Sequence, residues 1–315
     1  MKENQIIVSL TGGLGNQLFQ LAAALNIFGD RKIVLTSNYG NPRPFNQWYA
    51  DLYSFALPKN VVIAKKKRAS FLSKKCLGYN LRMGVSPRKY EEAAAVKWLI
   101  DIASKFLIGV DLGKSVDLIA GKGVGYCEIN AGNKSSILIG YFQSYKWVAD
   151  PRVKKELMNI SPIMYSDELK ILVNESLAEM PLFVHVRLTD YKVEEKFGVP
   201  SKEYYEKAIK SFMDSGSFSR IWLFSDDSVL ALTYIPDEYH EIVKIVPEVG
   251  RSPTQTLELL RYGSGYVIAN SSFSWWGAKL AYKDNVRVVA PSPWFKGLHD
   301  QIDLIPPNWE TMKPW

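Results

Sequence analysis

Two short segments of this sequence place polar side chains where an anionic ligand could bind. In the first, the apolar run Leu182–Val186 predicts a buried strand, and Arg187 follows directly after it. Alternate residues of a strand share a face, so His185 and Arg187 would point the same way at the strand's end. The planar guanidinium of Arg187 is permanently charged and fits the oxygens of a phosphate. The alternative for Arg187 is a surface ion pair with Asp190.

The second segment is a polar turn that leads directly into a predicted helix over residues 271–282. Backbone N–H groups in the first turn of a helix have no partner inside the helix, and serine hydroxyls stand beside them here. Such groups, together with the positive end of the helix dipole, bind anions. We therefore expect the two segments to form a diphosphate site in an α/β sheet. The candidates in the second segment are Asn270, Ser271, Ser272, Phe273 and Ser274.

A glycine-rich loop at residues 12–17 follows a predicted strand and precedes a helical pattern. It lacks the third glycine of a dinucleotide fingerprint and the Gly-Lys-Ser/Thr of a P-loop. What remains is a tight turn that lets the backbone approach a ligand, with a purely structural turn as the alternative. The candidate ligand contacts in this loop are Gly13, Gly15, Asn16 and Gln17.

Asp226 and Asp227 form the only adjacent pair of aspartates, and they follow a predicted strand at 221–224. Ligands bind at the carboxyl ends of the strands in open α/β sheets, so both acids are candidates for contact with a ligand. A ribose or a metal could bind there. The alternative is that the pair only caps a helix.

The elements that must position these residues alternate between strand and helix, as parallel sheets require. Strands at 6–10 and 32–36 enclose the glycine loop and its helix, and four strand-helix repeats occupy the second half. The sequence therefore predicts an α/β fold with two Rossmann-like domains. We expect an N-terminal domain at residues 1–165 with a helical insertion at about 40–132, a C-terminal domain at 166–290, and a surface-wrapping tail at 291–315.

The composition limits the classes of function. With 47% hydrophobic and 23% charged residues the chain is globular, and its two cysteines argue against a disulfide scaffold. No signal peptide and no membrane-spanning run is apparent, so we expect a cytoplasmic protein. Much of the net charge of +7 lies between Lys65 and Lys89. No reader motif supports nucleic-acid binding by this segment. Peripheral contact with anionic lipid at the inner face of a membrane and a solvated surface remain as interpretations.

Three motifs in this order resemble those of the α-1,2-fucosyltransferases of glycosyltransferase family 11. They lie at residues 12–20, 185–191 and 270–278, and residues 140–144 match a further stretch of that family. The resemblance implies a GT-B architecture, in which two Rossmann-like domains with parallel sheets face a central cleft. It also implies that the second domain holds most of the donor, GDP-fucose, and that the transfer inverts the anomeric configuration without a metal or other cofactor.

Carried over by position, the resemblance gives Arg187 the β-phosphate, His185 the nucleoside, and residues 272–274 the diphosphate. This chain departs from the family at two places. Leu188 stands where a second arginine is common, and the acid nearest to Thr256, where related enzymes read guanine, is Glu258.

The expected function is transfer of L-fucose to a glycan acceptor, at the 2-OH of galactose, in the synthesis of a surface polysaccharide or glycan. Arg187 and the helix start at 271–274 would stabilise the departing diphosphate. The candidates for the general base, by proximity in the sequence alone, are Asp190, Glu194 and Glu195. Two alternatives remain open: a transferase of the same fold that uses another nucleotide sugar, and a non-catalytic protein that binds nucleotide sugars or glycans.

Overall fold

The computed structural model divides the chain into two compact units, Met1–Ser161 and Pro162–Trp315. The boundary lies four residues before the predicted one, and each unit is described by itself below. The structure describes residues 4–37, 39, 50–64, 69–85, 94–113, 115–121, 124–189, 197–247, 249–297 and 303–315. Among these residues, no helix is long and apolar enough to cross a membrane.

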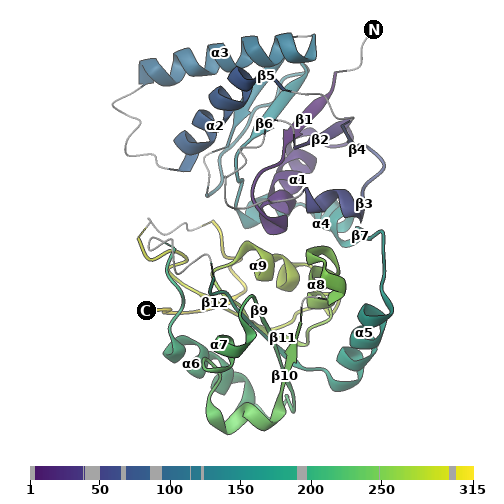
Figure 1. Cartoon of the computed structure of the whole chain (residues 1–315), viewed down its shortest axis with the longest axis vertical. Helices are drawn as coiled ribbons and strands as arrows, with labels where there is room; N and C mark the ends of the chain where they lie inside the picture. The colour runs from purple at the N-terminus through teal and green to yellow at the C-terminus, as the bar shows by residue number, and fades with distance from the viewer. Residues whose placement is uncertain are drawn as a thin grey trace. The chain divides into compact units, whose positions relative to one another are not determined.

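A parallel sheet of five strands forms the centre of the N-terminal unit (Figure 1). Its strand order is β4-β2-β1-β6-β5, and every pair of neighbouring strands is parallel. The strands are β1 (Ile6–Ser9), β2 (Ile33–Thr36), β4 (Val61–Ile63), β5 (Asp117–Ala120) and β6 (Ser136–Ile139). Both edge strands, β4 and β5, come from the stretch that was expected to be a helical insertion. They are three and four residues long, too short for a clear alternation of apolar and polar residues.

Helices cover both faces of this sheet (Figure 1). One face packs Ile7, Ile137 and Ile139 against Leu77 of α2 and Ile108 of α3. The glycine loop continues into α1 on the other face. The helices are α1 (Leu14–Phe28), α2 (Phe71–Val85), α3 (Ala94–Leu112) and α4 (Pro151–Met158), with 3-10 turns at η1 (Asp51–Ser54) and η4 (Tyr145–Val148). The short strands β3 (Phe55–Ala56) and β7 (Ser161–Pro162) form a separate pair.

The C-terminal unit has a parallel sheet of six strands in the order β10-β9-β8-β11-β12-β13. The strands are β8 (Leu182–Val186), β9 (Ile221–Ser225), β10 (Val243–Val246), β11 (Gly265–Val267), β12 (Val288–Pro291) and β13 (Glu310–Met312). The predicted surface tail therefore supplies β13, an edge strand. Two parallel α/β units confirm the predicted fold class.

The helices of the C-terminal unit begin where polar caps stand in the sequence. Ser166 and Ser201 accept hydrogen bonds from the third helical N–H of α5 and α6. Helix α6 buries Tyr205, Ile209 and Phe212 against the sheet. The helices are α5 (Asp167–Glu179), α6 (Lys202–Met213), α7 (Ser228–Leu232), α8 (Pro253–Leu260) and α9 (Ser272–Lys279), with 3-10 turns at η5 (Asp237–Ile242) and η6 (Val249–Arg251).

The strand order of this sheet reverses at β8. From β8 the chain moves outward through β9 and β10, then returns to place β11 on the other side of β8. A sheet has a topological switch point where the connections from two neighbouring strands run in opposite directions. Open α/β sheets bind ligands at this point. The carboxyl ends of β8 and β11 are therefore the expected site edge.

Candidate active site

The two segments singled out in the sequence meet at this switch point. Strands β8 and β11 pair in parallel with Val184 opposite Val267. His185 and Arg187 therefore lie at the end of β8, and β11 lies directly beside it. Strand β11 leads through residues 268–271 into α9. The ring of Phe273, in the first turn of α9, lies 6.1 Å from the ring of His185. The structure thus brings together the strand end and the helix start that the sequence predicts.

His185 is buried, with 6% of its surface exposed, and its Nδ1 has no hydrogen-bond partner among the described residues. Burial and, to a smaller extent, the charge of Arg187 lower the pKa of the imidazole to about 3, although Asp226 opposes the shift. The ring is therefore neutral near pH 7. A buried ring nitrogen without a partner is costly unless a ligand supplies one, which fits a residue that contacts the donor.

Arg187 forms an ion pair with Asp226. Its Nε lies 3.3 Å from Oδ2 of Asp226, and the arginine side chain stays one-third exposed (33%). Asp190 belongs to the residues outside the described ranges, together with Glu194 and Glu195, so its role as a base stays a prediction.

Asp226 also holds the loop that follows β8. It accepts hydrogen bonds from the backbone N–H of Leu188 (2.9 Å) and Thr189 (3.0 Å), and from the Thr189 hydroxyl. Burial would raise the pKa of this carboxyl, but the Thr189 hydroxyl, the charge of Arg187 and the two backbone donors together hold it below its usual value. Asp226 is therefore ionised and orients Arg187 and its loop.

Asp227 acts differently from its neighbour. It is the N-cap of α7, and its carboxylate accepts a hydrogen bond from the Leu230 N–H at 3.1 Å. This is the structural alternative that the sequence left open. Contact of either aspartate with the donor stays a prediction.

The start of α9 is held by its own polar side chains. The Ser271 hydroxyl accepts a hydrogen bond from the Phe273 N–H (3.3 Å), and the Ser274 hydroxyl donates to the Ser271 carbonyl (3.2 Å). Asn270 donates to the carbonyls of Phe197 and Gly198, each at 3.0 Å. These hydroxyls and the amide are thus engaged in positioning the turn. The ligand-facing groups that remain are the first-turn backbone, with Ser272 and Phe273 half-buried there.

Buried packing fixes the rest of α9. The Trp275 indole donates to the Leu304 carbonyl at 3.0 Å, and Trp276 is fully buried beside it. A Cβ at Gly277 would come within 2.7 Å of the Leu260 Cβ, so glycine is needed where α9 packs on α8. The tryptophans are core residues, and they keep the helix start in place.

Comparison with known proteins assigns this arrangement. Residues 166–312 match the family model described as Glycosyl transferase family 11. These residues contain both segments of the candidate site, so the resemblance of their motifs to glycosyltransferase family 11 is confirmed.

Two Escherichia coli proteins are similar to the chain. One, named Alpha-1,2-colitosyltransferase, is 28% identical over 189 residues, which cover 58% of this chain and 64% of that protein. The aligned residues therefore span less than two-thirds of the length of the colitosyltransferase. The other, named O-antigen biosynthesis glycosyltransferase WbnK, is 25% identical over 319 residues, covering 95% of this chain and 98% of that protein.

Solved structures also resemble the fold. E. coli ADP-heptose LPS heptosyltransferase II matches with 11% identity and a TM-score of 0.49, over 98% of this chain and 90% of that one. Fucosyltransferase NodZ from Bradyrhizobium matches with 15% identity and a TM-score of 0.46, over 88% and 92%.

Glu258, a predicted donor contact, lies in a buried ion pair. Its side chain is 2% exposed and pairs with Nη1 of the equally buried Arg261 at 2.8 Å. The Tyr282 hydroxyl donates to it at 2.8 Å, and Arg261 lies over the Tyr282 ring at 4.1 Å. These contacts give the carboxylate a structural role that sequence spacing does not reveal. Contact of Glu258 with the donor stays a prediction.

The glycine loop of the N-terminal unit is organised by buried glutamines. Gln17 is fully buried, donates to the Gly12 carbonyl (2.9 Å) and accepts from the Leu52 N–H (3.1 Å). Gln20 bridges Thr11 to the Gly140 carbonyl at the end of β6. Gln17 therefore has a structural role in the loop, and its contact with a ligand stays a prediction.

For the other candidates in this loop, Gly13, Gly15 and Asn16, contact with a ligand stays a prediction. Gly13 is the N-cap of α1, and a Cβ there would meet nothing within 4 Å. The Asn16 amide oxygen accepts from Gln143 at 2.6 Å, and Gly15 is buried in the first turn. Sequence reasoning missed Gln20 and Gln143. The second could have been found, since it stands within the family-like stretch at 140–144.

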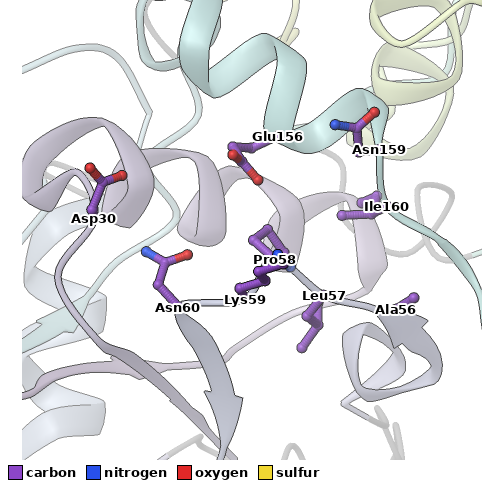
Figure 2. Close-up of a pocket in the computed structure, with 9 residues that line it drawn as sticks. All are labelled: Asp30, Ala56, Leu57, Pro58, Lys59, Asn60, Glu156, Asn159 and Ile160. Atoms are coloured by element: carbon purple, nitrogen blue, oxygen red, sulfur yellow. The ribbon is translucent and has the colours of Figure 1, made fainter.

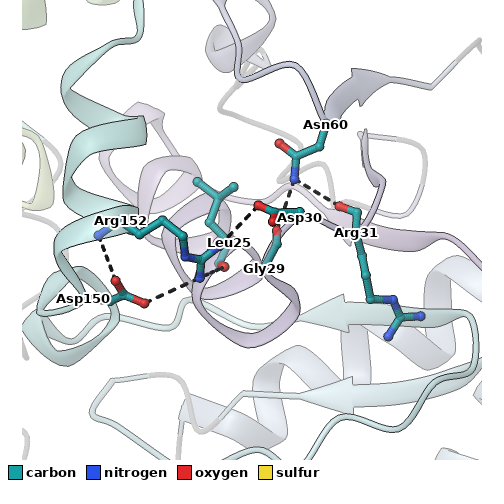
Figure 3. Close-up of polar contacts among 7 residues, drawn as sticks. All are labelled: Leu25, Gly29, Asp30, Arg31, Asn60, Asp150 and Arg152. Atoms are coloured by element: carbon teal, nitrogen blue, oxygen red, sulfur yellow. Dashed lines mark hydrogen bonds and ion pairs between the residues drawn. The ribbon is translucent and has the colours of Figure 1, made fainter.

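A pocket of about 550 Å³ lies elsewhere in the N-terminal unit (Figure 2). Asp30 and Asn60, on its wall, precede β2 and β4, so the pocket is at the amino edge of the sheet, opposite the glycine loop. Around it, Asn60 donates to the Gly29 and Arg31 carbonyls, and Arg152 approaches Asp30 at 3.8 Å (Figure 3). These contacts join loops to each other, and ligands bind at the other edge in such sheets.

Proposed function

We propose that the protein transfers L-fucose from GDP-fucose to a glycan acceptor, at the 2-OH of galactose, during synthesis of a surface polysaccharide. The observation that carries this proposal is the placement of His185 and Arg187 beside the start of α9, at the switch point within the residues that match family 11. The name of WbnK, a relative that aligns along nearly the whole chain, supports the biosynthetic setting.

The proposed reaction needs positive charge at the leaving group. The acceptor hydroxyl attacks the anomeric carbon from the face opposite GDP, the bond to the β-phosphate breaks, and the diphosphate gains charge. The Arg187 guanidinium, held by Asp226, and the dipole of α9 can stabilise that charge. Asp190 is the proposed acceptor of the hydroxyl proton. Because a fixed cation already serves the diphosphate, we propose that no metal is required.

Recognition of guanine has no assigned carboxylate in this proposal, because Glu258 is engaged with Arg261. A second donor is therefore a real alternative, and one specific observation favours it. The colitosyltransferase that aligns with this chain is named for a sugar other than fucose. A transferase that uses another nucleotide sugar is the competing function.

Nucleotide binding and turnover separate these candidates. GDP at a hundredfold excess over its dissociation constant should stabilise the fold by about 2.7 kcal/mol, while UDP and CDP should do little. Turnover of GDP-fucose with simple galactosides, followed by analysis of the linkage, tests the transfer. Equal stabilisation by all three nucleotides would overturn the guanine assignment. Binding of GDP-fucose without turnover on an acceptor array would favour a non-catalytic binding protein.

A further inference from the structure

The outward side of α3 has the wrong chemistry for a helix that faces water. One stripe of α3 packs inward, with Ile108 and Ser104 buried. The opposite side exposes Trp98 (63%), Ile102, Phe106 (70%) and, one turn further, Val110. These four follow each other at intervals of four residues, so they form a continuous apolar stripe. A surface helix normally carries polar residues on that side.

Helix α2 extends the same surface. It packs beside α3, where Asn80 donates to the Ser104 hydroxyl at 2.9 Å, and both helices rest on the same face of the sheet (Figure 1). Its outward side exposes Phe71, Leu72 and Tyr79. We refer to the exposed apolar side chains of these two helices as the α2–α3 outer face. Apolar patches of this kind on a protein surface mark sites of interaction.

The segment of the sequence that supplies this face is rich in positive charge. Residues 65–112 hold eleven Lys and Arg against four Asp and Glu, which equals the whole net charge of +7, since the rest of the chain holds 28 of each. Among the described side chains, Lys75 lies on the outer side of α2 with its Nζ 4.6 Å from the Phe71 ring, and Lys105 is exposed on α3. Cationic and aromatic groups are thus mixed on one surface.

We propose that the α2–α3 outer face docks on the surface of an anionic lipid bilayer. Helices that lie in the membrane interface combine Trp, Phe and Leu on one side with Lys and Arg at the rim, and anionic headgroups attract the rim. A second copy of the chain is the weaker occupant, because symmetric pairing would bring two strongly cationic segments together. The proposal does not depend on which sugar is transferred.

Vesicle sedimentation tests the proposal with the full chain. The protein should sediment with phosphatidylcholine vesicles that contain phosphatidylglycerol, should not sediment with phosphatidylcholine alone, and should be released as ionic strength rises. Phe106→Asp should weaken vesicle binding at least about tenfold, since a large buried side chain is lost and a like charge is added. Leu177→Asp is the matched control, because Leu177 is equally exposed on α5 of the other unit (60%). It should bind as the unsubstituted chain does.

Two further measurements separate the sources of binding. Lys74→Glu with Lys75→Glu should reduce binding to anionic vesicles by roughly fivefold for each charge removed. Bromine-labelled lipid should quench Trp98, with Trp98→Phe as the blank, and circular dichroism verifies that each variant is folded. Unchanged sedimentation of Phe106→Asp, or no binding to anionic vesicles at low salt, would overturn the proposal. So would a stable dimer that Phe106→Asp converts to monomer.

Discussion

The two units have similar sheets but different surfaces. Residues 1–161 hold 23 Lys and Arg against 11 Asp and Glu, whereas residues 162–315 hold 16 against 21. In the C-terminal unit the charges near the site are paired and positioned, as Arg187 and Asp226 are. In the N-terminal unit the excess of positive charge belongs to the segment that supplies the exposed apolar side chains of α2 and α3. The proposals above therefore give the two units different tasks, one binding a small anionic ligand and the other a large surface.

The glycine loop and the β8 end sharpen this contrast, because both follow the first strand of a parallel sheet. At the end of β8, His185 has a buried nitrogen without a described partner. At the end of β1, the buried amide of Gln17 already contacts Gly12 and Leu52. The ends of β1 and β8 therefore differ in whether their buried polar side chains already have hydrogen-bond partners within the described residues.

The largest effect should follow from Arg187→Ala. Loss of a fixed cation at the departing diphosphate should reduce kcat by about 10²–10³. Arg187→Lys should recover part of it, since a point charge does not reproduce the planar fork. Arg287→Ala is the control, because Arg287 pairs with Glu310 at the sheet edge (2.7 Å). Near-normal turnover in Arg187→Ala would make Arg187 a surface ion-pair residue.

Next in size is the loss of stability in Glu258→Gln. Breaking a buried pair leaves Arg261 charged without its partner, which should cost about 3–5 kcal/mol of unfolding free energy. The matched variant Glu203→Gln breaks an exposed pair with Lys207 and should change the unfolding free energy very little. Urea unfolding of both variants gives the comparison. If Glu258→Gln is stable but loses GDP affinity, the donor-binding prediction for Glu258 is supported.

Gln17→Ala should have a smaller effect, confined to the N-terminal unit. It leaves the Leu52 N–H without its acceptor, so we expect a loss of about 1–3 kcal/mol in unfolding free energy. The GDP dissociation constant, measured by calorimetry, should not change. A weaker GDP affinity at unaltered stability would instead assign Gln17 to the ligand.

The acid dependence of stability tests His185. Its folded pKa of about 3 lies below the ordinary 6.5, so the unfolded chain binds the proton first as the pH falls. The stabilising contribution is fully present above pH 6.5 and is lost toward pH 3, at up to about 1.4 kcal/mol per pH unit. His185→Gln should flatten the dependence between pH 6 and about 4 in thermal unfolding. An identical slope in both proteins would show that the ring is not buried in its neutral form.

The smallest expected effect is that of chelation. EDTA should leave turnover unchanged, because Arg187 and the α9 dipole provide the charge that a divalent cation would otherwise supply. Activity lost in EDTA and restored by Mn²⁺ would contradict this, and would place the ion at Asp226, which is ionised beside Arg187.

Sequence patterns predicted those features of the structure that depend on periodicity and on the order of elements along the chain. The strand-helix alternation predicted both parallel sheets, and Leu182–Val186 is β8 with the predicted bounds. The motifs at 185–191 and 270–278 predicted the family and the meeting of β8 with α9. Short edge strands such as β4 and β13 were missed, because three residues do not establish a period.

The sequence by itself determined which chemical groups are present and on which strand end or helix start they stand. Only the tertiary structure decided which of them are already engaged. Asp226 holds the β8 loop and Arg187, Asp227 caps α7, and Glu258 is neutralised by Arg261. The physical reason is that a polar group taken out of water must find a partner, and that partner comes from whichever element packs beside it, however far away in the chain.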